Sequence, residues 1–388
     1  MESVCVVGVA MVPFHEPGAG GSEAALGARA ARAALDDAGL SYAQVEQAYA
    51  GHACGDPFGG QRALYGLGMT GIPVVNVSSH DASGAVALFL ARQAVACGAV
   101  ECALALGFDQ PGAGASADLP EAFLDALDDL QGFDPEVPCE AQFFGGAARA
   151  YMREHGLRAE TLGHIAVKAR RHGASNPGAL ARTPLGLAEV MASPTVFAPL
   201  TRLQCCRPAS GAAAAVLCSP VFARRHGLPR QVEIAAQAMA SALPSALEGA
   251  DLRCLAGADM AQAAARQVYE AAGLGPADLD LVELHDSATA NELITYEALG
   301  LTAPGTAERF VLDGGNTYGG AIVTNPSGGL LARGNPPGAT GLAQCAELVW
   351  QLRGSAGARQ VEGARIALQH TLGLGGACVV GLYRAAGR

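Results

Sequence analysis

Four short segments of the chain carry side chains that can move protons or hold charge. The candidate catalytic residues are His80 and Asp81 in "SSHDASG", His285 and Ser287 in "LHDSAT", Asn335 in "GNPPGATG", and His370 in "LQHTLGLGG". Imidazoles and carboxylates serve as general acids and bases, whereas amides and hydroxyls can donate hydrogen bonds to a developing oxyanion. The chemistry available to this set is therefore proton transfer and oxyanion stabilisation.

The first of these segments lies directly before an apolar stretch, "AVALFLARQAVA", which predicts a buried helix. Asp and Ser are favoured helix N-caps, and such a cap stabilises a helix start by about 0.5–2 kcal/mol. His80 and Asp81 are therefore a catalytic pair, a helix cap or ordinary turn residues. Their adjacency in the sequence does not decide among these readings.

The elements that must position these residues begin with an alternation of strands and helices. Strands are expected over 3–14, 45–53, 71–79 and 101–108, and helices over 21–40 and 82–97. This alternation predicts a largely parallel sheet covered by helices. The segment from about residue 110 to 200 differs, and its first part is rich in Pro, Gly and acidic residues. We therefore expect an insertion of loops and short helices that covers a site.

A second, similar order follows residue 230. Strands are expected over 231–240, 279–287 and 365–384, and helices over 260–274, 291–301 and 341–354. In both parts a glycine-rich turn precedes a buried helix, at residues 79–84 and 334–341. The sequence therefore predicts two pseudo-equivalent α/β halves, 1–225 and 226–388, the first containing the insertion.

Composition excludes several classes of protein. Half of the 388 residues are hydrophobic, only 16% are charged and the net charge is −11, which disfavours nucleic acid as a partner. No apolar run approaches the roughly 18–20 residues that span a bilayer, and the N-terminus lacks the basic region of a signal peptide. Eleven scattered cysteines predict reduced thiols in a cytoplasmic protein. Adjacent Cys205 and Cys206 are unsuited to a zinc site, and we expect no metal.

Five longer stretches carry a resemblance to a known family. They are "GGQRALYGLGMTGIPVVNV", "EVMASPTVFAPLTRLQCCRPASGAAAA", "VELHDSATANELITYEALGL", "GGNTYGGAIVTNPSGGLLARGNPPGATGLAQCAELVWQLRG" and "RQVEGARIALQHTLGLGGA". From residue 4 to 384 the chain resembles the thiolase superfamily, most closely the sterol-carrier-protein-type thiolases and thiolase-like lipid-transfer proteins. The resemblance implies an α/β thiolase fold with five layers, αβαβα, formed by two duplicated halves with an inserted loop domain. It also implies a homodimer whose substrates are coenzyme A thioesters.

The resemblance also shows where this chain departs from the family. Thiolases carry a nucleophilic cysteine three residues before the glycine of the first turn, and here that position is Asp81. The family histidine that activates this cysteine is replaced by Asn335, which does not titrate. Close relatives have a proton-moving cysteine at Ser287. A carboxylate is a weak nucleophile toward a thioester and its anhydride hydrolyses readily, so an ordinary acyl-enzyme cycle is not expected.

Other family positions are retained. The resemblance implies that His285 helps to form an oxyanion hole and that His370 lies near the site. We expect Gly338, Gly375, Gly376 and Tyr318 to contact substrate, with Tyr318 a further candidate acid or base. For His370 the alternative is a hydrogen-bonded core histidine, and for Ser287 a helix cap.

Three functions remain open on the sequence. The first is an enzyme that performs aldol or retro-aldol chemistry on an acyl thioester of coenzyme A or phosphopantetheine, with Asp81 or His80 as base and no tightly bound cofactor. Thiolase-like aldolases are the family precedent for this change of chemistry. They work with a small OB-fold, zinc-ribbon protein, so the resemblance implies such a partner here. The second is an acyltransferase or Claisen-type condensing enzyme of secondary metabolism. The third is a non-catalytic acyl- or lipid-binding subunit of a thiolase-like complex.

Overall fold

The computed structural model describes residues 3–53, 56–110, 119–228 and 231–386. Its strands are β1 (Val4–Met11), β2 (Gln47–Gly51), β3 (Val74–Val77), β4 (Cys102–Asp109), β5 (Thr195–Phe197), β6 (Leu200–Thr201), β7 (Gly211–Cys218), β8 (Val232–Ala240), β9 (Leu281–Glu283), β10 (Val323–Thr324), β11 (Ile366–Gly373) and β12 (Ala377–Ala385). Its α-helices are α1 (Glu23–Ala38), α2 (Gly59–Tyr65), α3 (Ser83–Ala96), α4 (Glu121–Gln131), α5 (Cys139–His155), α6 (Ala159–Ala174), α7 (Leu187–Met191), α8 (Pro220–Arg225), α9 (Ser245–Glu248), α10 (Leu252–Leu255), α11 (Ala258–Ala272), α12 (Thr289–Ala298), α13 (Ala307–Leu312), α14 (Gly329–Arg333) and α15 (Pro337–Arg353).

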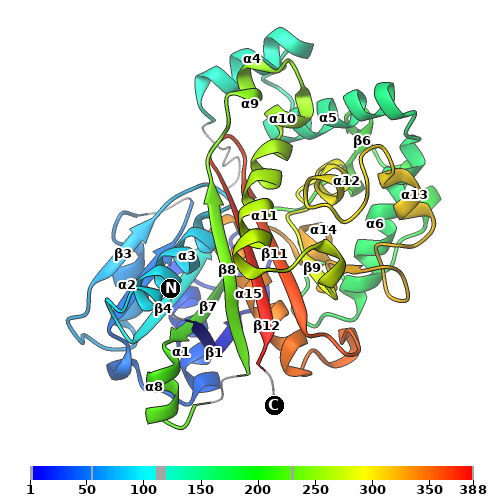
Figure 1. Ribbon diagram of the computed structural model, residues 1–388. Coiled ribbons are helices and arrows are strands. Elements are labelled where there is room, and N and C mark those ends of the chain that lie inside the picture. Colours follow the sequence, from blue (N-terminus) through cyan, green and yellow to red (C-terminus); the bar gives the residue numbers. More distant parts are fainter. Residues whose placement is uncertain (1–2, 54–55, 111–118, 229–230, 387–388) are drawn as a thin grey trace.

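Ten of the strands form one sheet in the order β10-β9-β11-β12-β8-β1-β7-β4-β2-β3. The sheet consists of two groups of five strands with the same internal order. From the outer edge of the sheet to its middle, each group places its third, second, fourth, fifth and first strand, numbered along the chain within the group. The groups meet where β1 pairs with β8 through Val4 with Ile234 and Cys5 with Glu233. Figure 1 shows β8 at this junction, between the blue N-terminal strands and red β12.

The sheet is mixed, so the expectation of a largely parallel sheet is wrong. Parallel pairing is confined to β2 with β3 and β4, and to β9 with β10 and β11. The strands nearer the middle of the sheet pair antiparallel. One of these pairs is the β11–β12 hairpin, whose short turn cannot hold the crossover that parallel neighbours need. The α/β class itself is confirmed.

Helices form layers around these strands. α1 packs on β1 and β7, and α11 packs on β8 and β12. Between the two groups of strands, α3 and α15 contact each other and share one hydrophobic core with strands of both halves. Both helices are buried on nearly all sides, which explains why their sequences are mostly apolar.

The N-terminal ends of α3 and α15 approach each other through glycine. A Cβ atom on Gly84 would lie 2.2 Å from the carbonyl oxygen of Gly338, and one on Gly338 would lie 2.6 Å from the carbonyl oxygen of Phe108. Any side chain at either position would therefore push the helix ends apart. This contact brings the turn that contains Asp81 next to the segment that contains Asn335.

The insertion is more helical than expected. Its helices α5 and α6 have 17 and 16 residues, and both bury an apolar face, so the expectation of short helices is wrong for this part. Residues 111–118 of the insertion lie outside the described residues. Lys168 of α6, the sole lysine of the chain, is buried and ion-pairs with buried Glu292 of α12. This pair ties the insertion to the C-terminal half.

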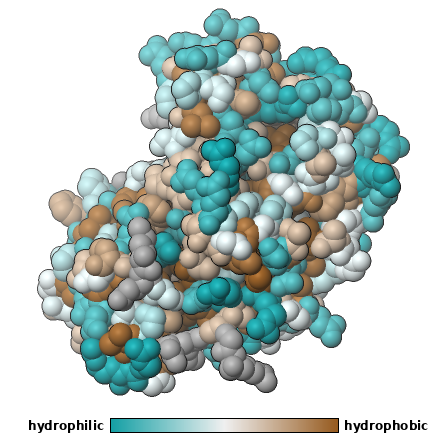
Figure 2. All heavy atoms as spheres, viewed as in Figure 1, coloured by the Kyte–Doolittle hydropathy of each residue, from teal (hydrophilic) through white to brown (hydrophobic). Residues whose placement is uncertain are grey.

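Within the described residues, none of the helices has both the length and the apolar character needed to cross a bilayer. On the face shown in Figure 2, hydrophobic residues are interspersed with hydrophilic ones.

Candidate active site

The turn before α3 is held by its own polar groups. The Ser79 amide donates to Ser83 Oγ over 2.8 Å, and Ser83 Oγ donates to the His80 carbonyl oxygen over 2.6 Å. His80 adopts a left-handed backbone conformation with φ of 50°, which is uncommon outside glycine. The N-cap residue of α3 is Ala82, without a side-chain cap. The reading of Asp81 as a helix cap is therefore wrong.

The Asp81 carboxylate is buried and contacts three polar side chains. Its Oδ2 atom accepts a hydrogen bond from Asn335 Nδ2 at 3.2 Å and lies 3.4 Å from His285 Nε2 and 3.8 Å from His80 Nδ1. Four of the six candidate residues thus meet at one oxygen atom. In this arrangement His285, expected to help form an oxyanion hole, is directed at the carboxylate, and so is Asn335.

Asp81 is held in its ionised form. Burial would raise the pKa of its carboxyl, but the charge of His80, the contacts of His285 and the hydrogen bond from Asn335 together hold the pKa below its usual range. A carboxylate with a low pKa is a weak base. It is, however, well suited to orient an imidazole and to stabilise the imidazolium that forms when that ring takes up a proton.

Acid should remove the stability that ionised Asp81 contributes. A group whose pKa is lowered by folding stabilises the fold above its unfolded value, here 3.8, and loses that contribution as the pH falls through the folded value. We expect the wild-type protein to exceed Asp81→Asn in urea midpoint near neutral pH, with the difference shrinking below pH 3.8. A difference that grows in acid would contradict this assignment.

Asn335 is oriented by a second hydrogen bond. Its Oδ1 atom accepts from Thr340 Oγ1 of α15 at 2.7 Å, so its Nδ2 atom is the one that faces Asp81. Its backbone amide donates to the Arg207 carbonyl oxygen at 2.9 Å. Asn335 therefore has a fixed donor in the position where the resemblance places the family's activating histidine.

The side chains of the adjacent residues His285 and Asp286 have different partners and different roles. His285 follows β9, and its carbonyl oxygen accepts from Asn291 Nδ2 at 2.8 Å, which fixes the backbone here. Asp286 points elsewhere: its Oδ1 atom accepts from the Leu330 amide of α14 at 2.7 Å. Burial raises the pKa of Asp286 well above its usual range. His285 thus belongs to the site, whereas Asp286 holds α14.

The proton positions on His285 and His370 follow from their contacts. Because Asp81 is ionised, the favourable form of His285 carries a proton on Nε2, which leaves Nδ1 with a free lone pair in the neutral ring. His370 Nδ1 lies 3.4 Å from the His285 amide and accepts from it, so its own proton sits on Nε2. Among the described residues neither His285 Nδ1 nor His370 Nε2 has a hydrogen-bond partner, and both atoms are buried.

His370 stays neutral in this setting. Burial, and after it the charge of His285, lowers the pKa of the His370 imidazole to about 3. A neutral imidazole with its proton on Nε2 is a donor only at that atom. The two rings therefore offer one unpartnered acceptor and one unpartnered donor.

Neither Ser287 nor the cysteine beside it, Cys206, is an activated nucleophile. The Ser287 hydroxyl is buried and lacks a hydrogen-bond partner within the described chain. Its carbonyl oxygen accepts from the Cys206 amide at 2.8 Å, which places Cys206 beside the site. Burial raises the pKa of the Cys206 thiol well above its usual value, and Glu140 and Asp81 add to the shift. A thiol of this kind is not a thiolate at neutral pH.

Sequence reasoning missed Glu140, in the first turn of α5. Its Oε1 atom lies 3.9 Å from His80 Nε2, and the ligand atoms of His80, Asp81 and Glu140 lie within 4.8 Å of one another. Burial and the charge of Asp81 raise the pKa of Glu140 to about 7, against the opposing charge of His80. A glutamate in the first turn of a helix is common, so the sequence carried no signal of this contact.

The remaining candidates make no hydrogen bond or ion pair with the Asp81 carboxylate in the described structure. Tyr318 donates to the Arg359 carbonyl oxygen at 2.5 Å and packs edge-on against His172, and burial raises its pKa, so it is not placed as an acid or base of this site. Gly338, in the first turn of α15, is buried against the N-terminal end of α3. Gly375, with φ of 70°, and Gly376 form the β11–β12 turn, where Gly375 packs against Pro120.

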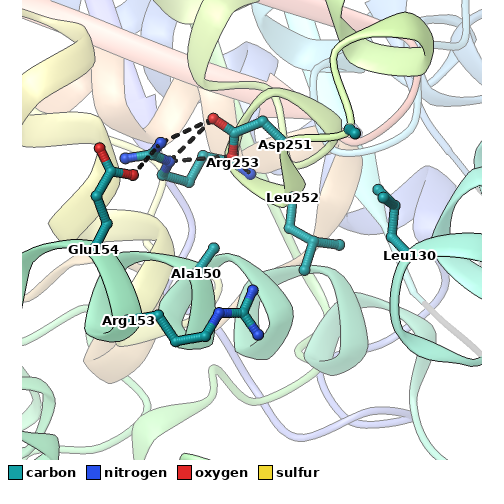
Figure 3. A pocket seen from close by; sticks show the side chains of 8 residues that line it. Leu130, Ala150, Arg153, Glu154, Asp251, Leu252 and Arg253 are labelled. Atoms are coloured by element: carbon teal, nitrogen blue, oxygen red, sulfur yellow. Dashed lines mark hydrogen bonds and ion pairs between the residues drawn. The ribbon is translucent and has the colours of Figure 1, made fainter.

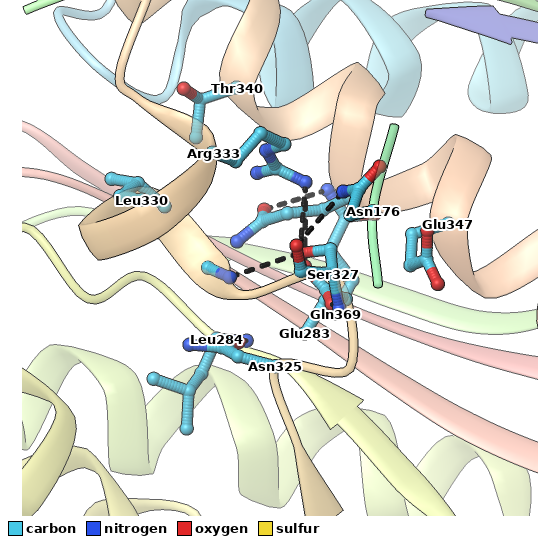
Figure 4. A network of polar contacts seen from close by, with 12 residues as sticks. Asn176, Glu283, Leu284, Asn325, Ser327, Leu330, Arg333, Thr340, Glu347 and Gln369 are labelled. Atoms are coloured by element: carbon cyan, nitrogen blue, oxygen red, sulfur yellow. Dashed lines mark hydrogen bonds and ion pairs between the residues drawn. The ribbon is translucent and has the colours of Figure 1, made fainter. Parts of the chain in front are cut away.

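A buried network positions the segment that leads to Asn335. Arg333, the last residue of α14, lies 3.5 Å from Glu283 Oε2, which also accepts from Ser327 Oγ at 2.8 Å (Figure 4). Both charged side chains are fully buried. Breaking such a pair leaves one charge without a partner, so the network fixes α14 and the residues after it.

A separate cavity of about 430 Å³ opens further along α5. Leu130, Ala150, Arg153, Glu154, Ala250, Asp251, Leu252 and Arg253 line it. Figure 3 shows Arg253 engaged by Asp251 and Glu154, at 2.9 and 2.7 Å. No lining residue belongs to the Asp81 cluster, and Ala150 is ten residues beyond Glu140, about 15 Å along the helix.

Comparisons with known proteins agree with this architecture. A thiolase N-terminal domain model matches residues 4–181, and a thiolase C-terminal domain-like model matches residues 228–380. "Sterol carrier protein 2" of Homo sapiens is 47% identical over 395 residues, which cover 99% of this chain and 72% of that protein.

Two solved structures extend the comparison. The "Ltp2-ChsH2(DUF35) aldolase" superposes with a TM-score of 0.85 at 25% identity, covering 99% of this chain and 98% of that one. Human mitochondrial 3-ketoacyl-CoA thiolase in complex with CoA superposes with a TM-score of 0.75 at 18% identity, covering 100% and 98%. The second likeness shows the fold alone. Together with the family matches, these findings make the chain a member of the thiolase superfamily, of the sterol-carrier-protein type, with a thiolase-like, acyl-CoA-related function.

Proposed function

We propose that this protein catalyses carbon–carbon bond chemistry of aldol or retro-aldol type on an acyl thioester, through an enolate and without a covalent acyl-enzyme. The observation that carries the proposal is the contact between Asp81 Oδ2 and His285 Nε2, 3.4 Å apart. It places an oriented carboxylate–imidazole pair where the resemblance puts the thiolase nucleophile. The pair supplies a base rather than a nucleophile.

His285 acts as that base through Nδ1, and Asp81 stays ionised. In the cleavage direction, Nδ1 takes the proton of a β-hydroxyl group, the bond between Cα and Cβ breaks, and a carbonyl group forms at Cβ. The electron pair of the broken bond moves into the thioester as an enolate. The imidazolium then returns the proton to Cα, so the cycle has no net proton change.

The enolate oxygen needs donors, and His370 offers one. Its Nε2–H is buried and has no partner in the described parts of the chain. A donor that is already in place before the reaction stabilises the oxyanion without any rearrangement of the site. Removing one such donor typically lowers the rate by about 10²–10³-fold. This assignment moves the oxyanion role from His285, where the resemblance placed it, to His370.

Coenzyme A or phosphopantetheine enters this scheme as part of the substrate. The human thiolase structure noted above holds CoA, and the proposal extends that substrate moiety to this chain. We also propose a small OB-fold, zinc-ribbon partner, supported by the two-component aldolase, and a homodimer. The dimer is supported by the edge strand β3 and the exposed apolar residues near it, Phe58, Tyr65, Met69 and Val75.

The test is exchange of thioester α-protons in D2O. Because the last step of cleavage protonates Cα, the enzyme must also catalyse its reverse, removal of an α-proton from a simple thioester. With propanoyl-CoA as the probe, we expect deuterium at Cα well above the buffer rate, measured by mass spectrometry of the thioester. Lack of exchange would overturn the proposal and favour a non-catalytic binding subunit. Exchange accompanied by an acyl-enzyme would favour the acyltransferase instead.

A further inference from the structure

His80, Asp81 and Glu140 form a compact cluster of side chains that can each bind a metal ion. One ligand atom of each, a ring nitrogen or a carboxylate oxygen, lies within 4.8 Å of the other two. In the parts of the chain that the structure describes, no other group of three or more His, Cys, Asp or Glu side chains is this compact. Geometry therefore distinguishes this cluster from the other polar groups of the molecule.

The two carboxylates of the cluster have no cationic partner of fixed charge. Among the described residues, Asp81 contacts the rings of His80 and His285, and Glu140 contacts the ring of His80. Neither carboxylate pairs with a lysine or an arginine of the described chain. A buried charge, such as that of Asp81, is normally paired with an opposite charge or bound to a metal ion. With both carboxylates ionised and the rings neutral, the charge of the cluster matches a divalent cation.

We propose that His80, Asp81 and Glu140 bind one divalent transition-metal ion through one nitrogen and two oxygen ligands. The inference goes beyond the proposed function, because it concerns an ion-binding site and not the reaction. It replaces the expectation of no metal, which was drawn from the adjacent cysteines Cys205 and Cys206. Imidazole and carboxylate ligands together suit ions such as Zn²⁺ and Mn²⁺.

The spacing of the ligand atoms fits such an ion after a small movement. In a tetrahedral site with metal–ligand bonds of about 2.0–2.2 Å, neighbouring ligand atoms lie roughly 3.3–3.6 Å apart. His80 Nδ1 lies 3.8 Å from Asp81 Oδ2, and His80 Nε2 lies 3.9 Å from Glu140 Oε1. Shifts of about 1 Å or less at each side-chain tip would close the cluster around an ion. Three protein ligands would leave a fourth position for water or for an oxygen atom of a substrate.

The segments that carry the ligands hold them in place. The backbone of His80 is left-handed, and its carbonyl oxygen accepts from the Ser83 hydroxyl. His80 Nδ1 is buried without a hydrogen-bond partner in the described chain, so with the ring proton on Nε2 its lone pair is free for an ion. A carboxylate has about four lone-pair sites, so Asp81 can bind an ion and keep its other contacts. Glu140 belongs to α5, so the ion would tie the insertion to the turn before α3.

The test is Mn²⁺ binding to protein that has been treated with EDTA and dialysed. Mn²⁺ is the probe because it prefers oxygen ligands to the thiols of this cysteine-rich chain, and its free form is measured by electron paramagnetic resonance. We expect one ion bound per chain. Because the ion binds the folded protein, saturating Mn²⁺ should also raise the thermal midpoint.

Two variants locate the ion. Glu140→Gln keeps the length of the side chain, and His80→Asn keeps a residue that tolerates the left-handed backbone. Each should weaken Mn²⁺ binding at least tenfold and reduce the rise in thermal midpoint. Glu136→Gln, the same chemical change at an exposed residue just before α5, should bind Mn²⁺ as wild type does.

The outcomes separate the two proposals. Absence of saturable Mn²⁺ binding below about 1 mM would overturn the ion site. Equal affinity in wild type, Glu140→Gln and His80→Asn would also overturn it, because the ion would then bind elsewhere in the chain. Mn²⁺ binding that the two variants weaken, together with no deuterium exchange into propanoyl-CoA with or without Mn²⁺, would support the ion site and overturn the proposed function alone.

Discussion

Replacing Asp81 with asparagine is expected to slow deuterium exchange into propanoyl-CoA by about 10²–10⁴-fold, the usual contribution of general acid–base catalysis. Asparagine preserves the shape of the side chain but removes its charge. Without that charge His285 loses the group that fixes its proton on Nε2 and stabilises its imidazolium form. The measurement is the initial rate of exchange at saturating thioester.

Asp313→Asn is the matched control, since it makes the same chemical change at an exposed residue of the C-terminal half whose side chain pairs with Arg309. We expect its exchange rate to equal that of wild type. An Asp81→Asn variant that folds and exchanges at the wild-type rate would show that the carboxylate takes no part in catalysis.

The second large effect is expected for His285→Asn. The amide can still donate to Asp81 but cannot accept a proton at neutral pH, so exchange should again fall by about 10²–10⁴-fold. Residues that act as a unit give non-additive losses. The double variant of Asp81→Asn and His285→Asn should therefore be about as slow as the slower single variant. Multiplied losses in the double variant would show that the two residues act independently.

His172→Asn controls for the loss of a buried histidine. His172 lies on α6, where its ring contacts the Asn325 carbonyl oxygen and Thr317 Oγ1 at 3.0 and 2.8 Å. Burial lowers its pKa to about 3, so it stays neutral and serves structure. We expect this variant to lower the thermal midpoint while retaining exchange. Equal losses of exchange in His172→Asn and His285→Asn would point to a general packing defect.

The sequence predicted those parts of the fold that local patterns determine. The strand over 231–240 and the helix over 341–354 are confirmed as β8 and as part of α15, because their hydrophobic patterns match the layers that bury them. The direction of neighbouring strands was not predictable in this way. The antiparallel pairs β1–β7 and β4–β7 join strands far apart in the sequence, and no local pattern specifies them.

The candidate site was predictable as a set of residues but not as an arrangement. Asp81, His285 and Asn335 were named from short motifs, and the structure brings them to one carboxylate oxygen. That the donors face Asp81 depends on Thr340, which orients the Asn335 amide, and on the turn around His80. Glu140 could not be found from sequence, because only the packing of α5 against the core brings it beside His80.

The central claim, enolate chemistry without an acyl-enzyme, is tested most directly by intact-protein mass spectrometry during exchange. The wild-type protein is incubated with propanoyl-CoA in D2O and divided between two quenches: acid, which preserves thioester and ester acyl groups, and hydroxylamine, which leaves a hydroxamate on Asp81 when it attacks the aspartyl carbonyl of an anhydride. We predict that α-deuterated propanoyl-CoA accumulates while the protein keeps its unmodified mass at every time point. A propanoyl or hydroxamate modification that appears at the exchange rate, on Asp81, Ser287 or Cys206, would contradict the account.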